Sequence, residues 1–306
     1  MKLSHLPLFF APGLSEGVEL TFDGKRNGDR LLDGRLLARG AEIGKVENGV
    51  AIFVEPSNWP PAEIQKLRDM NAIPNNWNGQ SRSVNWKGQS SPPSAEPAKS
   101  FHDALDSVAT SGGYILDVAS GPGGGVAAAV LSRNPDANII MNDISAPVLE
   151  LWREFLAERG IGDNICFAAF DASNMPVRTG TMDAIANMGG FGNIGDKDHD
   201  AIREACRVLK PGGRVFSFEL VLEPESLQKL PDPMRTRHAA QVSGHGMAPF
   251  LEAEGLTVES KHNVGGRELV PEEGGLPTRA ARHGVTLRVA YELLIARKPA
   301  NAGRGT

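Results

Sequence analysis

The stretch that decides the fold of this 306-residue chain is Tyr114-Ile115-Leu116-Asp117-Val118-Ala119-Ser120-Gly121-Pro122-Gly123-Gly124-Gly125. An apolar run ends in an acidic residue, a glycine-rich segment follows, and the alanine-rich segment 126–131 comes next. This order predicts a buried strand, a tight turn and a helix. Glycine lets the backbone approach a ligand closely, and the N–H groups at a helix start favour a negative group. A dinucleotide-binding fold uses the same device, so this stretch alone leaves the cofactor open.

Outward from this turn, short apolar runs alternate with helical segments from Phe101 onward. The predicted strands are 114–118, 138–141, 165–170, 183–187, 214–219, 257–261 and 287–296, and the predicted helices include 147–159, 198–209 and 249–255. The alternation is typical of a parallel sheet with crossover helices. We therefore expect an α/β fold with a doubly wound, mostly parallel seven-stranded sheet over residues 101–299.

The chain before this region has a different pattern. Residues 1–74 read as a small β-rich appendage with one helix, and Asn48-Gly49 between apolar runs predicts a hairpin turn. Residues 75–100 are polar and contain Trp77 and Trp86, which predicts a loop that serves either as a linker or as a lid. Residues 300–306 are expected to be a flexible tail.

Polar residues also follow the other predicted strands. Asp143 ends an apolar strand about 20 residues beyond the glycine turn, where a carboxylate would bind a ribose diol; it could also cap the helix that begins near Pro147. The further segments are Phe170–Pro176, Met182–Gly192 and Ala205–Arg214, the last containing a Lys-Pro-Gly-Gly helix stop.

These five segments, in this order, resemble the class I S-adenosylmethionine-dependent methyltransferases. The sequences LDVASGPGG (116–124) and RVLKPGGRV (207–215) are most similar to the ubiquinone/menaquinone-biosynthesis-like branch, and the likeness covers about 114–220. It implies a Rossmann-like fold, S-adenosylmethionine as cofactor and methyl transfer as activity. One departure is Ala119, which stands where the family has its first motif glycine.

The resemblance also assigns roles to particular residues. Asp117 and the turn Ala119, Ser120, Gly121, Pro122 and Gly123 would hold the methionine part of the cofactor. Asp143 would bind the ribose hydroxyl groups, Ile144 would pack on the adenine, Asp171 with Ala172 would read the adenine amino group, and Asn187 with Met188 would lie under the cofactor.

The acceptor side is expected beyond the fourth and fifth strands, because the cofactor motifs occupy the first three. The candidates there are Phe191, Asn193, Glu219, His238 and His245. The catalytic residue stays unknown. Methyl transfer needs alignment and exclusion of water, and it needs a general base only when the acceptor must lose a proton.

Composition narrows the class of partner. The net charge is −5, so no global basic field attracts nucleic acid, and no apolar run is long enough to span a membrane. Cys166 and Cys206 lack the spacing of metal ligands, so no metal site is expected. We expect a cytoplasmic enzyme acting on a small organic molecule, with its oligomeric state left open.

Other functions remain open. An RNA or protein methyltransferase is the second choice of substrate class, and a cofactor-binding protein of the same fold without catalysis is a further one. A nicotinamide-dependent oxidoreductase is disfavoured, because its glycine pattern would put Ala119 at the first glycine and would not explain Asp171 or Lys210–Gly213.

Overall fold

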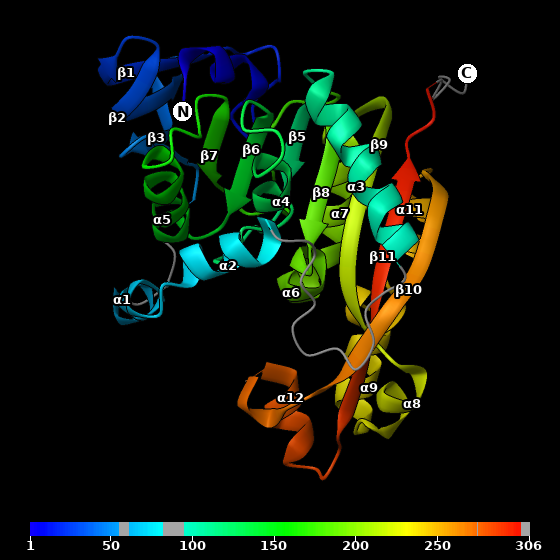
Figure 1. Cartoon of the computed structure of the whole chain (residues 1–306). Helices are drawn as coiled ribbons and strands as arrows, with labels where there is room; N and C mark the ends of the chain where they lie inside the picture. Colours follow the sequence, from blue (N-terminus) through cyan, green and yellow to red (C-terminus); the bar gives the residue numbers. More distant parts are fainter. Residues whose placement is uncertain (55–60, 82–94, 274, 301–306) are drawn as a thin grey trace.

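A computed structural model describes residues 1–54, 61–81, 95–273 and 275–300 of the chain. Its strands are β1 (Leu20–Asn27), β2 (Arg30–Ala38), β3 (Ala41–Glu47), β4 (Val50–Ile52), β5 (Tyr114–Asp117), β6 (Asn138–Asp143), β7 (Ile165–Ala169), β8 (Met182–Met188), β9 (Leu209–Leu222), β10 (Thr257–Leu269) and β11 (Leu287–Arg297). In this part of the chain they form one eleven-stranded sheet in the order β1-β2-β3-β4-β7-β6-β5-β8-β9-β11-β10 (Figure 1).

Helices cover both faces of this sheet. They are α1 (Pro61–Asp69), α2 (Ala72–Ser81), α3 (Ala95–Thr110), α4 (Ala127–Leu131), α5 (Ala146–Ala157), α6 (Gly190–Ile194), α7 (Asp198–Val208), α8 (Pro224–Lys229), α9 (Asp232–Ala239), α10 (Val242–His245), α11 (Ala248–Ala253) and α12 (Gly275–Ala281), with the 3-10 helices η1 (Leu3–Leu8), η2 (Gly195–Lys197) and η3 (Pro271–Glu273). Helices α3, α4 and α5 lie on one face, and α7 and α11 lie on the other (Figure 1). No helix of the described residues is both long enough and apolar enough to cross a membrane.

The centre of the sheet is parallel and doubly wound, as expected. The chain passes from β5 through β6 to β7 toward one edge and then returns to β8 and β9 on the other side of β5. The strand order therefore reverses between β5 and β8, the point at which open α/β sheets bind ligands at the carboxyl ends of their strands. Strands β11 and β10 complete this edge in antiparallel pairing.

The seven-stranded count and the separate N-terminal appendage are not confirmed, because β1–β4 continue the same sheet. Strand β4 pairs in parallel with β7, with Ala51 beside Ala168 and Ile52 beside Ala169. Without β4 the fully buried β7 would be an edge with unpaired backbone groups, which is costly. The hairpin between β3 and β4 is confirmed, with φ of +48° at Asn48 and +78° at Gly49.

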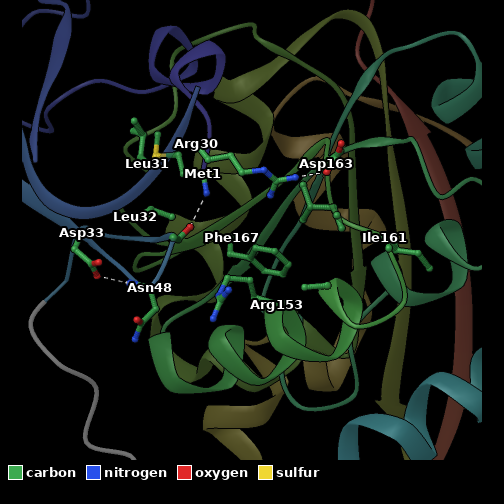
Figure 2. A pocket seen from close by; sticks show the side chains of 15 residues that line it. Met1, Arg30, Leu31, Leu32, Asp33, Asn48, Arg153, Ile161, Asp163 and Phe167 are labelled. Atoms are coloured by element: carbon green, nitrogen blue, oxygen red, sulfur yellow. Dashed lines mark hydrogen bonds and ion pairs between the residues drawn. The ribbon is translucent and has the colours of Figure 1, made fainter. Parts of the chain in front are cut away.

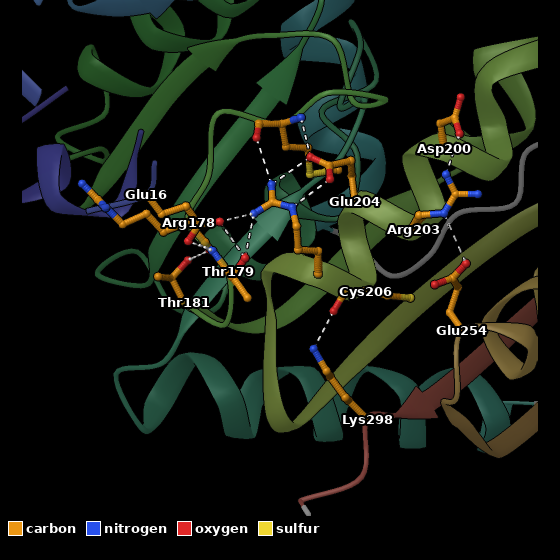
Figure 3. Close-up of polar contacts among 12 residues, drawn as sticks. Glu16, Arg178, Thr179, Thr181, Asp200, Arg203, Glu204, Cys206, Glu254 and Lys298 are labelled. Carbon is orange, nitrogen blue, oxygen red and sulfur yellow. Dashed lines mark hydrogen bonds and ion pairs between the residues drawn. The ribbon is translucent and has the colours of Figure 1, made fainter. Parts of the chain in front are cut away.

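Polar contacts also tie the N-terminal segment to the rest of the molecule. Glu16 accepts a hydrogen bond of 2.7 Å from the Thr179 hydroxyl, and the two lie side by side in Figure 3. The Arg207 guanidinium on α7 donates to the same Glu16 carboxyl at 3.1 Å. The N-terminal residues are therefore built into the main body, although the domain boundaries at residues 74, 100 and 299 remain predictions.

The loop expected at 75–100 is in part helical. Helix α2 continues to Ser81 and α3 begins at Ala95. Trp77 of α2 stands edge-on to Phe155 of α5 with 5.8 Å between ring centroids, and this tertiary contact explains a helix whose Asn- and Gly-rich sequence has poor helix propensity. Trp86, which belongs to the proposed linker or lid, lies outside the described residues, as do 301–306 of the expected tail.

Strands β9, β11 and β10 are the longest of the sheet and extend beyond their neighbours into a lower lobe (Figure 1). Helices α8, α9 and α12 gather around this extension (Figure 1). The lobe has its own small apolar cluster, formed by Leu222, Leu230, Ala280, Leu287 and Val289. It therefore adds a second wall beyond the carboxyl end of β9.

Candidate functional site

The glycine turn between β5 and α4 folds tightly because two of its glycines face the protein. A Cβ at Gly124 would lie 2.3 Å from the Trp152 ring, and a Cβ at Gly125 would lie 2.3 Å from the Asp117 carboxyl group. A Cβ at Gly123 would meet nothing within 4 Å, so this side of the turn borders open space. The turn thus borders open space at Gly123, where a ligand can approach the backbone.

Asp117 holds this turn from beneath. Its fully buried carboxyl group accepts hydrogen bonds from the Ser120 hydroxyl at 2.8 Å and from the Val126 and Ala127 N–H groups at 3.1 Å each. Burial raises the pKa of Asp117 to about 7, although the hydrogen bonds from these donors act to lower it. Both oxygens are thus engaged inside the protein, and Asp117 supports the turn at the start of α4.

Asp143 links the glycine turn to the next crossover. One carboxyl oxygen accepts from the Gly121 N–H at 2.9 Å, and the other accepts from the Ser145 N–H at 2.8 Å. Burial raises the pKa of Asp143. The neighbouring Ile144 is 51% exposed at the same strand end, which is unusual for a large apolar side chain and leaves a face for a planar ligand.

Asn142 is a positioning residue that the sequence analysis did not identify. Its Oδ1 accepts from the Ala119 N–H at 3.3 Å, and its Nδ2 donates to the carbonyl groups of Ala168 and Phe170 at 3.2 and 3.0 Å. Ala119 has a φ of +52°, so this contact helps to hold a conformation that alanine adopts at a cost. The sequence feature that could have indicated this role is a polar residue within an otherwise apolar, buried strand.

Asp171 lies at the carboxyl end of β7 and is engaged within the protein. It accepts hydrogen bonds from Lys197 Nζ at 2.8 Å and from the Ser173 hydroxyl at 2.7 Å. Partial burial opposes ionisation, but the contacts with Lys197 and Ser173 hold the pKa of Asp171 below its usual value. Ala172 beside it is buried. Any ligand contact of Asp171 would compete with the Lys197 ion pair.

Helix α2 reaches the glycine turn from the N-terminal region, which the sequence did not predict. Asn76 donates a hydrogen bond of 2.8 Å from its Nδ2 to the carbonyl group of Pro122. This contact joins a residue of the predicted loop to the turn itself. The wall beside the turn is therefore made partly by residues that precede the 101–299 region.

The polar residues at the ends of β8 and β9 form a buried cluster. Asn187 Nδ2 donates to a Glu219 oxygen at 2.5 Å, and the other Glu219 oxygen accepts from the Gly192 N–H at 3.4 Å. The Asn187 Oδ1 is buried without a hydrogen-bond partner in the described structure. Met188, which follows Asn187, lies on the opposite face of the sheet and packs against the α3–α5 side.

A cavity of about 300 Å³ opens beside this cluster. It brings together three of the five predicted acceptor-side residues, Asn193, Glu219 and His238. His238 Nδ1 lies 2.9 Å from the Ser243 hydroxyl, and burial lowers the pKa of its ring. Phe191 is instead fully buried in the core, and His245 is exposed and does not line this cavity.

A second cavity, of about 370 Å³, lies at the opposite end of the sheet, between β2, the β3–β4 turn and α5 (Figure 2). Arg153 and Phe167 line it, and Arg30 forms an ion pair with Asp163 at its rim (Figure 2). It borders Ile165, the first residue of β7, whereas α/β sheets bind ligands at the carboxyl ends. The candidate site is therefore the glycine turn with the cavity beside Glu219.

No group of three or more His, Cys, Asp and Glu side chains is arranged to hold a metal ion within the ranges that the structure describes. Both cysteines are buried and free. Burial raises the pKa of Cys166 to about 11 and that of Cys206 to about 12. Neither thiol is therefore a nucleophile near neutral pH.

Comparisons with known proteins agree with this geometry. Residues 115–213 match the family described as a methyltransferase domain. The chain is 33% identical over 117 residues to the ubiquinone/menaquinone biosynthesis C-methyltransferase UbiE of Pseudomonas paraeruginosa (strain DSM 24068 / PA7), which covers 38% of this chain and 45% of the relative. It is 38% identical over 111 residues to UbiE of Pseudomonas entomophila (strain L48), covering 36% and 42%. The chain thus spans less than half the length of these relatives.

A solved structure extends the likeness in fold. The crystal structure of the [4+2]-cyclase SpnF superposes with a TM-score of 0.50 at 19% identity, covering 81% of this chain and 98% of that one. At this identity the comparison concerns the fold alone. Residues 115–213 thus match a methyltransferase domain, and the chain is similar over 117 residues to a ubiquinone/menaquinone biosynthesis C-methyltransferase, in agreement with the doubly wound strand order and the glycine turn.

Proposed function

We propose that the chain transfers a methyl group from S-adenosylmethionine to a small organic acceptor. One observation carries the proposal: the glycine turn and the cavity beside Glu219 meet at Gly190. A Cβ there would lie 2.7 Å from the Val118 carbonyl oxygen and 3.1 Å from the Ala119 Cβ. The adjoining residues Gly189 and Gly192 line the cavity. A donor held on the turn and an acceptor held in the cavity would therefore be neighbours.

The residues present fit the cofactor. The open space beside Gly123 suits the methionine part, and the exposed Ile144 suits one face of the adenine. Asp143 would hold the ribose hydroxyl groups, because a carboxylate has about four lone-pair positions and the Gly121, Ser145 and Ile144 N–H groups do not fill them all. Asp171 with Ala172 would face the adenine amino group, and Asn187 with Met188 would lie at the inner end of the site.

When bound, S-adenosylmethionine supplies a methyl group on a positively charged sulfur, which is a good leaving group. The protein then has to orient the acceptor and to exclude water. The walls of the cavity are suited to both tasks, since the lower lobe closes it beyond β9 and Asn193 is fixed by a 2.7 Å hydrogen bond from its Nδ2 to the Gly189 carbonyl group.

A small-molecule acceptor is supported by the size of the cavity, about 300 Å³, and by the similarity to methyltransferases of ubiquinone/menaquinone biosynthesis. The fold by itself does not fix the reaction, since a [4+2]-cyclase shares it. An RNA or protein substrate, a cofactor-binding role without catalysis and a nicotinamide-dependent reaction are therefore outcomes that the experiment has to separate.

Calorimetry of the full chain with S-adenosylhomocysteine and with NADH tests the cofactor. We expect binding of S-adenosylhomocysteine and none of NADH, followed by label transfer from methyl-labelled S-adenosylmethionine to members of a panel of small phenols and quinols. Tight NADH binding without S-adenosylhomocysteine binding would refute the proposal. Label transfer to RNA or protein alone would show that the acceptor is a macromolecule and not a small molecule.

A further inference from the structure

The cavity beside α6 ends on a buried acid. Glu219 is only 1% exposed, yet it lines the cavity together with Asn193 and His238. Its donors are the Asn187 amide at 2.5 Å, the Gly192 N–H at 3.4 Å and the Phe191 N–H, and none of these is a cation. A carboxyl group has further lone pairs, so Glu219 can also contact a ligand in the cavity.

A second acid faces Glu219 across the sheet. Glu292 on β11 lies directly opposite Glu219 on β9 in the antiparallel pair, so both side chains point to the same face of the sheet. Lys261 Nζ lies 2.8 Å from one Glu292 oxygen, while the other is buried without a hydrogen-bond partner in the described structure. Lys261 thus offsets part of the negative charge of Glu292, and the remaining charge acts on Glu219.

These neighbours and the burial of the site set the pKa of Glu219. Burial first, and the Glu292 charge in addition, raise the pKa of Glu219 to about 8, although the Asn187 amide and the Phe191 and Gly192 N–H groups act in the opposite direction. The other titratable side chain on the cavity wall is His238, whose pKa burial lowers, so that it stays neutral. Glu219 therefore gains and loses its proton near neutral pH, as a general base must.

The rest of the cavity selects against charged ligands. Its apolar walls are Leu220, Leu222, Leu269, Leu276, Pro277 and Val289. A volume of about 300 Å³ is at the small end of the usual range for ligand pockets. A compact apolar molecule, such as one with one or two fused rings, would pack against the apolar walls and direct a polar group at Glu219.

We propose that Glu219 is the base that removes the proton of a phenolic or enolic hydroxyl group from a compact apolar acceptor. The inference rests on the proposed methyl transfer. In the step, the O–H bond breaks and its proton goes to a Glu219 carboxylate oxygen. The acceptor oxygen uses the freed electron pair to bond the methyl carbon, and the carbon–sulfur electron pair stays on sulfur, which leaves as a neutral thioether.

The test uses 1-naphthol as probe and three forms of the full chain: wild type, Glu219→Gln and the matched control Glu223→Gln. Glu223 carries the same group four residues along the chain, is partly exposed beside Arg288 and does not line the cavity. In fluorescence titrations at pH 8.5, a pH at which Glu219 is largely ionised, E219Q should bind 1-naphthol at least about 10-fold more weakly, as expected for losing a hydrogen bond to a charged group. E223Q should stay within about twofold of wild type, a range typical of surface changes. Equal binding by E219Q and wild type would overturn the proposal.

Infrared spectroscopy supplies a readout that needs no turnover. In wild type and in E223Q, a C=O stretch of a protonated, buried carboxyl group should disappear with a midpoint near pH 8, and this band should be absent from E219Q. The separate band of Asp117, whose pKa burial raises to about 7, should be the same in all three forms. Retention of this band in E219Q would show that it belongs to another residue, and loss of the band well below pH 7 would show that Glu219 is an ordinary ionised acid. Either result would overturn the assignment.

Two further arms separate this inference from the proposed function. Failure of wild type to bind S-adenosylhomocysteine would reject methyl transfer, while the naphthol and infrared arms would still decide the role of Glu219. With the cofactor bound, wild type should form 1-methoxynaphthalene at a rate that rises from pH 6 to 8, and E219Q should be about 100-fold slower. Absence of product from cofactor-loaded wild type would overturn the phenolic acceptor alone.

Discussion

Two polar regions at the carboxyl end of the sheet are built in opposite ways. In the glycine turn, both oxygens of Asp117 and both oxygens of Asp143 accept hydrogen bonds from nearby residues of the chain. In the cluster around Glu219, the Asn187 Oδ1 and the Glu292 Oε1 are buried without partners in the described structure. The carboxyl groups of the first region thus have partners at both oxygens, although the Ser145 hydroxyl group beside Asp143 is buried without a partner in the described structure, whereas the second region leaves an amide oxygen and a carboxyl oxygen unpaired.

The difference follows from where the donors come from. The N–H groups that donate to Asp117 belong to the start of α4, only nine and ten residues along the chain. The local course of the backbone therefore places them close to the carboxyl group. The cluster around Glu219 combines side chains from β8, β9 and β11 with a backbone group of α6, and no local motif can supply its missing donors. A self-sufficient turn suits an invariant cofactor, whereas unpaired buried atoms suit a ligand that brings its own polar group.

Replacing Asp117 should have the largest effect on stability. Asp117→Ala leaves three buried donors without their acceptor, and we expect the free energy of unfolding to fall by about 3 kcal/mol or more. Asp117→Asn keeps one acceptor oxygen and should lose about half as much. Urea denaturation measures both. A loss below about 1 kcal/mol for the alanine variant would mean that the turn does not depend on this carboxyl group.

Replacing Asp143 should act mainly on the cofactor. Asp143→Ala should weaken S-adenosylhomocysteine binding by about 1.5–3 kcal/mol in calorimetry, because hydrogen bonds between ribose and a charged group are lost. Asp136→Ala, which removes an exposed carboxyl group near the other end of β6, should leave affinity unchanged. If Asp143→Ala folds and binds as wild type does, the carboxyl group serves only Gly121 and Ser145.

The pH dependence of stability should distinguish the cluster around Glu219. Folding raises the pKa of Glu219 from 4.5 to about 8, so the folded protein holds this proton more tightly, and wild type loses stability as the pH rises across that window. Glu219→Gln lacks this loss. Its stability relative to wild type should therefore increase by about 1–2 kcal/mol between pH 5 and 8. Thermal or urea unfolding at several pH values measures it, with Glu223→Gln as the flat control.

The smallest effect is expected at Ala119, within the glycine turn. Ala119→Gly removes the strain of a φ of +52° but adds freedom to the unfolded chain, so we expect a gain of at most about 1 kcal/mol. Ala127→Gly in α4, where φ is helical, should lose about 1 kcal/mol instead. A destabilising Ala119→Gly would show that the methyl group packs usefully against Gly190.

The sequence by itself determined the features whose causes are local. The strand–turn–helix around Asp117, the hairpin at Asn48-Gly49 and the apolar face of α5 all follow from residues a few positions apart. The parallel central strands and the methyltransferase domain followed from the order of such motifs. These predictions held because backbone conformation and hydrophobic periodicity act over short distances along the chain.

Only the tertiary structure decided how distant segments meet. It joined β4 to β7 and so extended the sheet to eleven strands, and it brought Asn76 to the Pro122 carbonyl group. Among the acceptor candidates it gathered Asn193, Glu219 and His238 around one cavity, while Phe191 entered the core and His245 stayed outside. Edge pairing and the burial of a single side chain depend on which surfaces remain available after the whole chain has packed, and this information is not contained in any local pattern.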